Sequence, residues 1–225
     1  PGGDFTLGSI TVGNARGGNR FLKEDDFALY VQADFDADVF GRPFRGNVGL
    51  RHVWTTLYAE GYSSTGGGTL VFDTNEYQDS LPSLNLTYEP IDDVLVRFGA
   101  ARVMARPQIN NSLSGANYLV PTTSLNATGP NYTATIGNVD LDPFRASTYD
   151  LALEWYFAPE SLISFAYFYK DIDTYIQVIR QDLTYAQLTA LNPSAFDASF
   201  CSGTCSPTTI FALTSAVNTD GGPLK

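Results

Sequence analysis

His52 is the only histidine of this 225-residue chain, so any nucleophile–histidine–acid arrangement would have to use it. It falls on the apolar side of an alternating segment, which argues against a catalytic role. Asp150 and Glu154 share one side of a second alternating segment and could suggest a glycosidase. Four residues along a strand span about 13 Å, more than the roughly 5–9.5 Å that separates paired catalytic carboxyl groups. The sequence therefore predicts no catalytic residue and a protein that is not an enzyme.

Cys201 and Cys205 are the only cysteines, and they lie close together in FCSGTCS. With one distant histidine they cannot supply four zinc ligands, so we expect no metal site, and no motif indicates a cofactor. A small disulfide-closed loop, formed in an oxidising compartment, is the preferred interpretation. Two free thiols are the alternative.

The chain is acidic, with 13 Lys and Arg against 24 Asp and Glu and a formal net charge of −11. This balance argues against a nucleic-acid partner, which needs a basic surface. The 13 Tyr, 15 Phe and 20 Gly favour an all-β protein with many turns. No run of 18 apolar residues is present, so a transmembrane helix is not expected. Strands of a membrane β-barrel alternate and leave no such run.

Period-two alternation predicts about six strands. In STYDLALEWYF one face carries Leu151, Leu153, Trp155 and Phe157, and the other carries Asp150, Ala152 and Glu154. Similar alternation begins at Phe27 and recurs in RGNVGLRHVWTT, LPSLNLTYE, VLVRFGA and SLISFAYFYKDI. We expect the apolar faces to contact lipid, the polar faces to line a lumen, and each strand to have roughly the 9–11 residues that cross a bilayer.

The connections between these strands are of two kinds. DADVFGRPF, PIDD and APES are short and rich in turn residues, as hairpin turns should be. The connections that join one hairpin to the next are long or Gly-rich. Strict alternation of short and long connections places all short turns at one end, which is typical of an outer-membrane barrel. A soluble β-sandwich is the competing interpretation.

Aromatic residues in the long loops are candidates for stacking on sugar rings, because Asn and Thr are plentiful beside them. They are Tyr118, Tyr132, Tyr185, Phe196 and Phe200. The alternative is that these rings pack the loops on themselves. Within the last loop, LTYAQLTALNPSAF has a weak helical period that ends at Asn192 and Pro193, which predicts a short helix.

Four segments resemble, in order and spacing, the C-terminal barrel half of TonB-dependent outer-membrane receptors. They are LPSLNLTYE at 81–89, VRFGAARVMARPQ at 96–108, GNVDLDPFRASTYDLALEWYFAP at 137–159 and FYKDIDTYI at 168–176. ARP at 105–107 and GN-x-DL-x-P at 137–143 are specific when they occur together. The likeness is nearest to a proteobacterial subfamily whose members often belong to saccharide-uptake systems.

The resemblance implies an antiparallel transmembrane β-barrel of roughly 22 strands, of which this chain supplies about six. It also implies an N-terminal plug that engages the TonB complex, a small solute ligand, outer-membrane lipid and lipopolysaccharide as neighbours, and the outer membrane of a Gram-negative bacterium. The chain contains neither plug nor TonB box, so we expect it to be part of a larger barrel. Structural roles are expected for the motif residues Arg102, Arg106, Pro107, Gly137, Asn138, Asp140 and Pro143. Arg102 and Arg106, with Arg145, bracket the longest internal loop and are expected to anchor it.

We expect residues 1–26 to form an extracellular loop or strand extension, and residues 27–180 to form barrel strands with short periplasmic turns and long extracellular loops. Residues 181–225 are expected to be an extracellular loop with the short helix and the disulfide. The predicted function is uptake of a scarce solute with TonB-transduced energy, and an oligosaccharide is favoured. Alternatives are a receptor for a siderophore or other metal chelate and, from another class, a soluble carbohydrate-binding or adhesive β-module.

Overall fold

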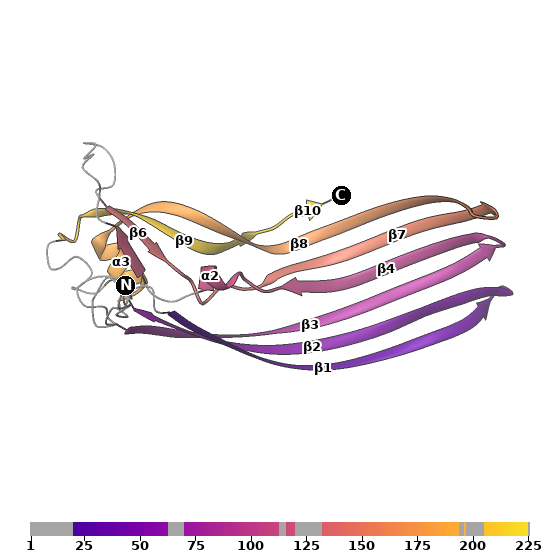
Figure 1. Ribbon diagram of the computed structural model, residues 1–225, viewed down its shortest axis with the longest axis horizontal. Coiled ribbons are helices and arrows are strands. Elements are labelled where there is room, and N and C mark those ends of the chain that lie inside the picture. The colour runs from indigo at the N-terminus through magenta and orange to yellow at the C-terminus, as the bar shows by residue number, and fades with distance from the viewer. Residues whose placement is uncertain are drawn as a thin grey trace, which may run out of the picture.

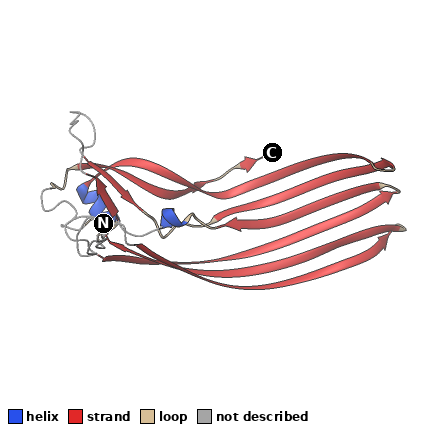
Figure 2. Ribbon diagram, in the orientation of Figure 1, coloured by secondary structure: helices blue, strands red, loops and turns tan. Residues whose placement is uncertain are grey.

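The computed structural model describes residues 20–62, 70–112, 116–119, 132–193, 196 and 205–224, with residues 116–119 described by their backbone alone. Strands dominate the fold (Figure 2). The elements in chain order are β1 (Arg20–Val39), β2 (Arg42–Tyr62), β3 (Leu70–Ile91), β4 (Val94–Ala105), α2 (Ile109–Ser112), β5 (Ala116–Leu119), β6 (Tyr132–Ile136), β7 (Phe144–Ala158), β8 (Ser161–Thr184), α3 (Tyr185–Leu191), β9 (Ile210–Asp220) and β10 (Pro223–Leu224). Neither helix in the described part of the chain is long and apolar enough to span a membrane.

One curved sheet contains all the strands, in the order β1-β2-β3-β4-β7-β8-β9-β6-β5, with β10 paired to β8. The six long strands β1 to β4, β7 and β8 run antiparallel to their neighbours. Their three hairpin turns lie together at one end, and α3 and β6 lie at the other (Figure 1). We call these the turn end and the loop end. This arrangement confirms the predicted layout of short and long connections.

Each hairpin turn has two central residues, and at least one of them has a positive φ angle, a conformation that most residues other than glycine avoid. Phe40 and Gly41 have φ angles of 54° and 71°, which fits the turn type that matches the twist of paired strands. Asp93 and Glu160 have φ angles of 63° and 59° at the second central position of their turns. Short polar residues and glycine tolerate this conformation best, so Phe40 is the least suited of the four.

The register gives the sheet two different faces, because cross-strand partners share a face. Tyr88, Val96, Leu153 and Phe165 form one continuous row across β3, β4, β7 and β8. The side chains predicted for lipid contact, Leu151, Leu153, Trp155 and Phe157, are each 44–49% exposed. No second sheet covers this apolar face among the described residues. The soluble sandwich is therefore excluded as the fold of the described chain.

The opposite face is polar in its middle. Arg97 on β4 donates from Nε to Glu154 Oε1 on β7 at 3.0 Å, and Asn85 on β3 donates to Asn47 Oδ1 on β2 at 2.9 Å. Glu154 thus lies on the face opposite Leu153 and Trp155, as the alternation predicts. We call this side the polar face.

Four of the six long strands, β1, β2, β3 and β8, are about twice as long as the sequence predicts, whereas β4 has 12 residues and β7 has 15. β1 has 20 residues and β8 has 24, so β1 is roughly 66 Å long at the usual rise. The expected 9–11 residues were those with apolar–polar alternation. On the N-terminal side of Phe27, β1 also includes Arg20–Asp26. Both faces of this part are largely polar, and its backbone ladder to β2 is unbroken. The hydrophobic pattern marks where a strand has one apolar face and does not mark where hydrogen bonding stops.

The segment 181–225, expected to be a loop, contains more regular structure than predicted. β8 runs to Thr184, and α3 follows with Thr184 as its N-cap and Gln187 completing a capping box. β9 then pairs with β8 over eleven residues. The sequence misses β9 because this strand is covered on both sides, with Phe211, Ala212 and Leu213 buried in succession, so its apolar residues do not alternate.

The sheet is open. β1 and β8 do not pair with each other, so the six long strands do not close into a small barrel. β1 has a strand partner only on its β2 side among the described elements. On its far side β8 pairs with β10 at Lys170 and Asp171 and with β9 from Thr174 outward.

The hydrophobic core lies at the loop end, where chain folds over the polar face. The largest cluster joins Val71 of β3 to Phe196, which follows α3 in the chain, and to buried residues of β6, α3 and β9, namely Ala134, Ile136, Leu188, Phe211 and Leu213. Val139 packs on Leu57 and Ala59 of β2 in a second cluster. Leu141 packs on Ile176 and Ala216 in a third. These contacts hold residues 132–143 against the inner side of the sheet.

The ladder between β3 and β4 ends well before β3 does. The last cross-strand pair is Ser83 with Ala101, whereas β3 continues outward to Leu70. No described strand pairs with residues 70–82 of β3 on that side. The two strands diverge toward the loop end (Figure 1). The gap in the ladder is closed by residues 137–143, which we call the strap.

Candidate functional site

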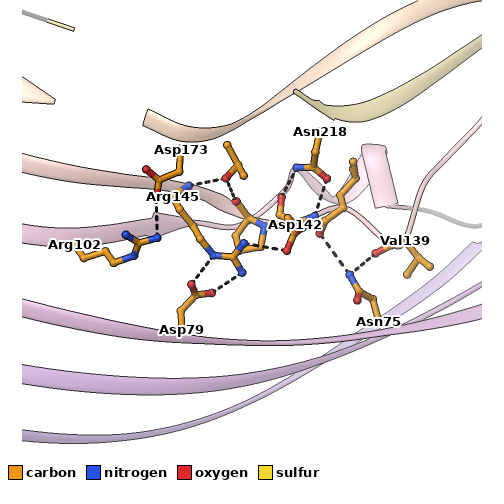
Figure 3. A network of polar contacts seen from close by, with 11 residues as sticks. Asn75, Asp79, Arg102, Val139, Asp142, Arg145, Asp173 and Asn218 are labelled. Atoms are coloured by element: carbon orange, nitrogen blue, oxygen red, sulfur yellow. Dashed lines mark hydrogen bonds and ion pairs between the residues drawn. The ribbon is translucent and has the colours of Figure 1, made fainter. Parts of the chain in front are cut away.

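Arg145, at the start of β7, is the centre of a polar network that joins the two sides of this gap (Figure 3). Its guanidinium donates from Nε to Asp79 Oδ1 at 2.6 Å and from Nη2 to Asp79 Oδ2 at 3.2 Å. A third bond reaches Asp142 of the strap at 3.0 Å. The Asp79 side chain is 5% exposed. A two-pronged, charge-assisted contact of this kind is among the stronger polar interactions.

Asn75 of β3 holds the strap by its backbone. Its Nδ2 donates to the carbonyl oxygen of Val139 at 3.0 Å and is 3.5 Å from that of Leu141 (Figure 3). A strap without regular structure needs such partners for its buried backbone groups. Asn75 is therefore a functional residue of this region that the sequence did not single out.

The strap is also tied to β9. Asn218 donates to the Asp142 carbonyl oxygen at 3.0 Å and accepts from the Asp142 backbone N–H at 2.9 Å. Asn138 donates to the Ala216 carbonyl oxygen at 3.2 Å, and its Oδ1 accepts from the Asp140 N–H at 3.0 Å. The Asn138 side chain thus fixes the start of GNVDLDP by bonds to β9 and to the backbone of Asp140.

The side chain of Arg106, in the ARP motif, contacts β1, which is three strands away from β4 in the sheet. Its Nη1 and Nη2 lie 3.2 Å and 2.8 Å from carboxylate oxygens of Glu24 and Asp26 on β1. Asp26 also accepts from the Thr55 hydroxyl at 2.6 Å. Arg102 instead pairs with Asp173 of β8 at 2.6 Å. Arg102, Arg106 and Arg145 thus each contact a carboxylate. Their role as anchors of the internal loop stays a prediction.

The remaining motif residues lie beside this network. Pro143 is fully buried and its carbonyl oxygen accepts from the Thr174 hydroxyl at 2.7 Å. Pro107 follows Arg106 directly and is half-buried. Gly137, Asn138 and Asp140 form part of the wall of a cavity.

This cavity has a volume of about 320 Å³ and opens between β3, the strap, the end of α3 and β9. Its polar lining consists of Asp73, Asn138, Asp140, Gln181, Asn192 and Ser215. Among the described residues that line it, none is Lys or Arg. Its size is at the lower end of that of small-molecule sites. The described part of the lining offers several hydrogen-bond acceptors and no positive charge.

Asp140 and Asp73 make this cavity anionic. Partial burial, and next the negative charge of Asp73, raise the pKa of the Asp140 carboxyl above its ordinary value. Two carboxylates that repel each other favour a ligand that donates hydrogen bonds to them or carries positive charge. Among the described residues, no group of three or more His, Cys, Asp or Glu is placed to hold a metal ion.

The loop aromatics do not form one surface. Phe196 is fully buried in the largest core cluster, and Tyr132 and Tyr185 pack against that cluster. The Tyr132 and Phe211 rings are stacked with centroids 5.1 Å apart. A fully buried ring offers no face to a sugar, so for Phe196 the structure shows the packing role that was the alternative. Phe200 and the side chain of Tyr118 lie outside the described residues, and their solute contact stays a prediction.

Of the two cysteines, Cys205 is among the described residues. Cys205 is disulfide-bonded and packs against the largest core cluster. Cys201 lies outside the described residues, so its role as the partner stays a prediction.

Long antiparallel strands with one exposed apolar face, joined by tight turns at one end and long loops at the other, are the architecture of a membrane β-barrel wall. The sequence model of the family described as TonB dependent receptor-like, beta-barrel, matches residues 2–212. The chain belongs to this family. A comparison with curated proteins finds no match.

Solved structures with a similar fold include two siderophore receptors. PirA from Acinetobacter baumannii is 14% identical, with a TM-score of 0.44 over 90% of this chain and 33% of that one. A mutant of the ferric enterobactin receptor PfeA from Pseudomonas aeruginosa is 13% identical, with a TM-score of 0.47 over 90% of this chain and 32% of that one. The chain spans about a third of the length of these receptors.

Proposed function

We propose that this chain is the barrel portion of an outer-membrane receptor that binds a scarce solute outside the cell and imports it with energy from the TonB complex. Membership of the TonB-dependent receptor family supports this role. In the whole receptor, an N-terminal plug engages TonB. The protein is a transporter and not an enzyme.

The apolar face supports a location in the outer membrane. Leu153, Trp155 and Phe165 are 44–70% exposed on it, which is costly in water and favourable in lipid. Outer-membrane lipid covers this face. Lipopolysaccharide contacts its loop end in the outer leaflet, where the strands continue beyond the apolar band.

The favoured solute is neutral and rich in hydroxyl groups, as an oligosaccharide is. The observation that carries this choice is the cavity, whose described lining contains two carboxylates and several amide side chains and no basic residue. Sugar hydroxyls donate to carboxylates and amide oxygens, whereas an anionic chelate would bring like charge beside Asp73 and Asp140.

A siderophore or other metal chelate is the second candidate, because the similar solved structures are named as siderophore receptors. Uptake assays separate the two. The full receptor is expressed in cells with and without TonB, and entry of radiolabelled neutral oligosaccharides is compared with entry of ferric siderophores.

TonB-dependent uptake of an oligosaccharide, lost in Asp73→Arg, is the expected result. The control is Asp150→Arg, on the polar face but away from the cavity. Uptake of ferric siderophores alone would overturn the proposal that the solute is an oligosaccharide, and the proposed receptor role would stand. Uptake of either solute without TonB would overturn the energy coupling.

A further inference from the structure

We propose that the line of contact between the strap and residues 70–82 of β3, here called the seam, is a latch that opens and closes the cavity. On their other side, residues 70–88 of β3 are joined to β2 by a backbone ladder, and from Ser83 to Tyr88 a second ladder joins β3 to β4. On the β4 side of residues 70–82 no described strand is paired, and side-chain contacts with the strap take the place of a ladder there. The inference does not depend on which solute the receptor carries.

The seam is closed by few contacts. Asn75 holds two strap carbonyls, and Arg145 joins Asp79 to Asp142. Apolar closure comes from Val139 over Leu57 and Ala59 and from Val71 beside β6. Local opening is easiest where few backbone hydrogen bonds must break, and lifting the strap from β3 breaks none of the ladders.

Residues of β3 and of the strap that meet at the seam also line the cavity. Val71 and Asp73 of β3 form one side of the cavity, and Asn138, Val139 and Asp140 of the strap form another. Separating the strap from β3 therefore opens the cavity onto the polar face of the sheet. A solute held there would then have a path toward the interior of the barrel that the closed seam blocks.

A buried cysteine can report this opening. Ala59 is 0% exposed beneath Val139, so Ala59→Cys in the full receptor should react slowly with a maleimide while the seam is closed. Cys205 is disulfide-bonded and does not compete if reductant is left out. Ala212→Cys, at a residue 1% exposed within the β9 ladders, reports opening elsewhere.

Asp79→Asn removes the charged partner of Arg145, and Asn75→Ala removes the bond to the strap without a change of charge. Each should raise the labelling rate of Ala59→Cys at least about tenfold, because a lost buried hydrogen bond shifts the opening equilibrium by that order. The rate of Ala212→Cys should not change. Asp150→Asn is the matched control, since Asp150 is exposed on the polar face and away from the seam.

Two results would overturn the latch. One is a labelling rate of Ala59→Cys that neither seam substitution changes. The other is an equal rise at Ala59→Cys and Ala212→Cys, which would mean general loosening of the fold. If Asp79→Asn fails to assemble, Asn75→Ala decides alone. Since the assay contains no solute, its failure is distinct from failure of the proposed uptake.

Discussion

The Arg145 guanidinium donates hydrogen bonds to both carboxylate oxygens of Asp79, at 2.6 Å and 3.2 Å, although the two residues are 66 positions apart in the chain. The contact joins the first residues of β7 to a part of β3 that has no ladder with β4. It replaces backbone pairing at the point where the sheet divides. The stability of the loop end should therefore depend on this pair more than on any other single ion pair among the described residues.

Replacing Asp79 by Ala should lower the free energy of unfolding by about 1–3 kcal/mol, because Arg145 would lose a nearly buried charged partner. Arg145 keeps Asp142, which limits the loss. Urea titration of the refolded receptor in lipid vesicles measures the effect. Asp150→Ala should change stability by much less, and equal losses in the two variants would show that Asp79 has no special role.

Leu153→Arg should cost about 2–4 kcal/mol if Leu153 lies near the bilayer midplane. Leu153 is in the centre of the apolar row, between Val96 and Phe165. Ala152→Arg, one residue away on the polar face, is the control and should cost less. The same titration compares them, and a greater loss for Ala152→Arg would reverse the assignment of the two faces.

Gly46→Ala should destabilise the sheet by about 1–3 kcal/mol through overpacking. A Cβ at Gly46 would clash with the Asn85 carbonyl oxygen and lie 2.6 Å from Cζ of Phe35, which covers the glycine. At Gly99 a Cβ would have its nearest neighbours at 3.7 Å and 3.8 Å. Gly99→Ala should therefore be tolerated, and similar unfolding midpoints for both variants would contradict the clash.

Asp140→Asn should stabilise the receptor slightly at neutral pH. Because the pKa of Asp140 is raised in the fold, the folded state binds a proton more readily than the unfolded state does. Stability then falls as the pH rises through the ordinary carboxyl pKa to the raised one. The gain should stay below about 0.5 kcal/mol, since the carboxyl is exposed and screened by solvent.

Unfolding midpoints of the two proteins, measured between pH 4 and pH 8, test this sign. The advantage of Asp140→Asn should be present at pH 7 and disappear in acid. A variant that loses stability at neutral pH would show that the charged carboxylate is favourable in the fold.

Phe40→Asn should stabilise the first hairpin by about 0.5–1 kcal/mol, because Asn accepts a positive φ at lower cost than an aromatic residue does. Phe40 has a φ of 54° and is 95% exposed, so little packing is lost. The rate of unfolding in urea, compared with that of the parent, measures the gain. A loss of stability would indicate that the Phe40 ring has a partner in the whole receptor.

Much of the sheet could be predicted from the sequence because the reasons for it are local. Alternation within STYDLALEWYF assigns Leu153 to one face and Glu154 to the other, whatever the strand pairs with. Phe40 and Gly41, Asp92 and Asp93, and Pro159 and Glu160 form turns for reasons contained in four residues. The family likeness rests on four segments, one of which contains STYDLALEWYF, and on the ARP and GN-x-DL-x-P motifs within them.

Strand length and β9 could not be predicted in this way. Beyond its apolar segment a strand can be largely polar on both sides, as Arg20–Asp26 are, and there its ladder with β2 keeps it extended. β9 is covered on both faces by chain from distant positions, so its apolar residues run together. In each case the deciding interaction comes from another part of the fold.

The sequence by itself therefore determined the class of fold, the two faces and the turn end. Only the tertiary structure brought Asn75 and Asp79 to the strap, placed Asp73 opposite Asp140 and enclosed Phe196. Asn75 and Val139 are 64 residues apart, and nothing in either local sequence indicates the other. Such pairs form because the ladder between β3 and β4 stops at Ser83, and beyond it the side chains of Asn75 and Asp79 bond to the strap and to the start of β7.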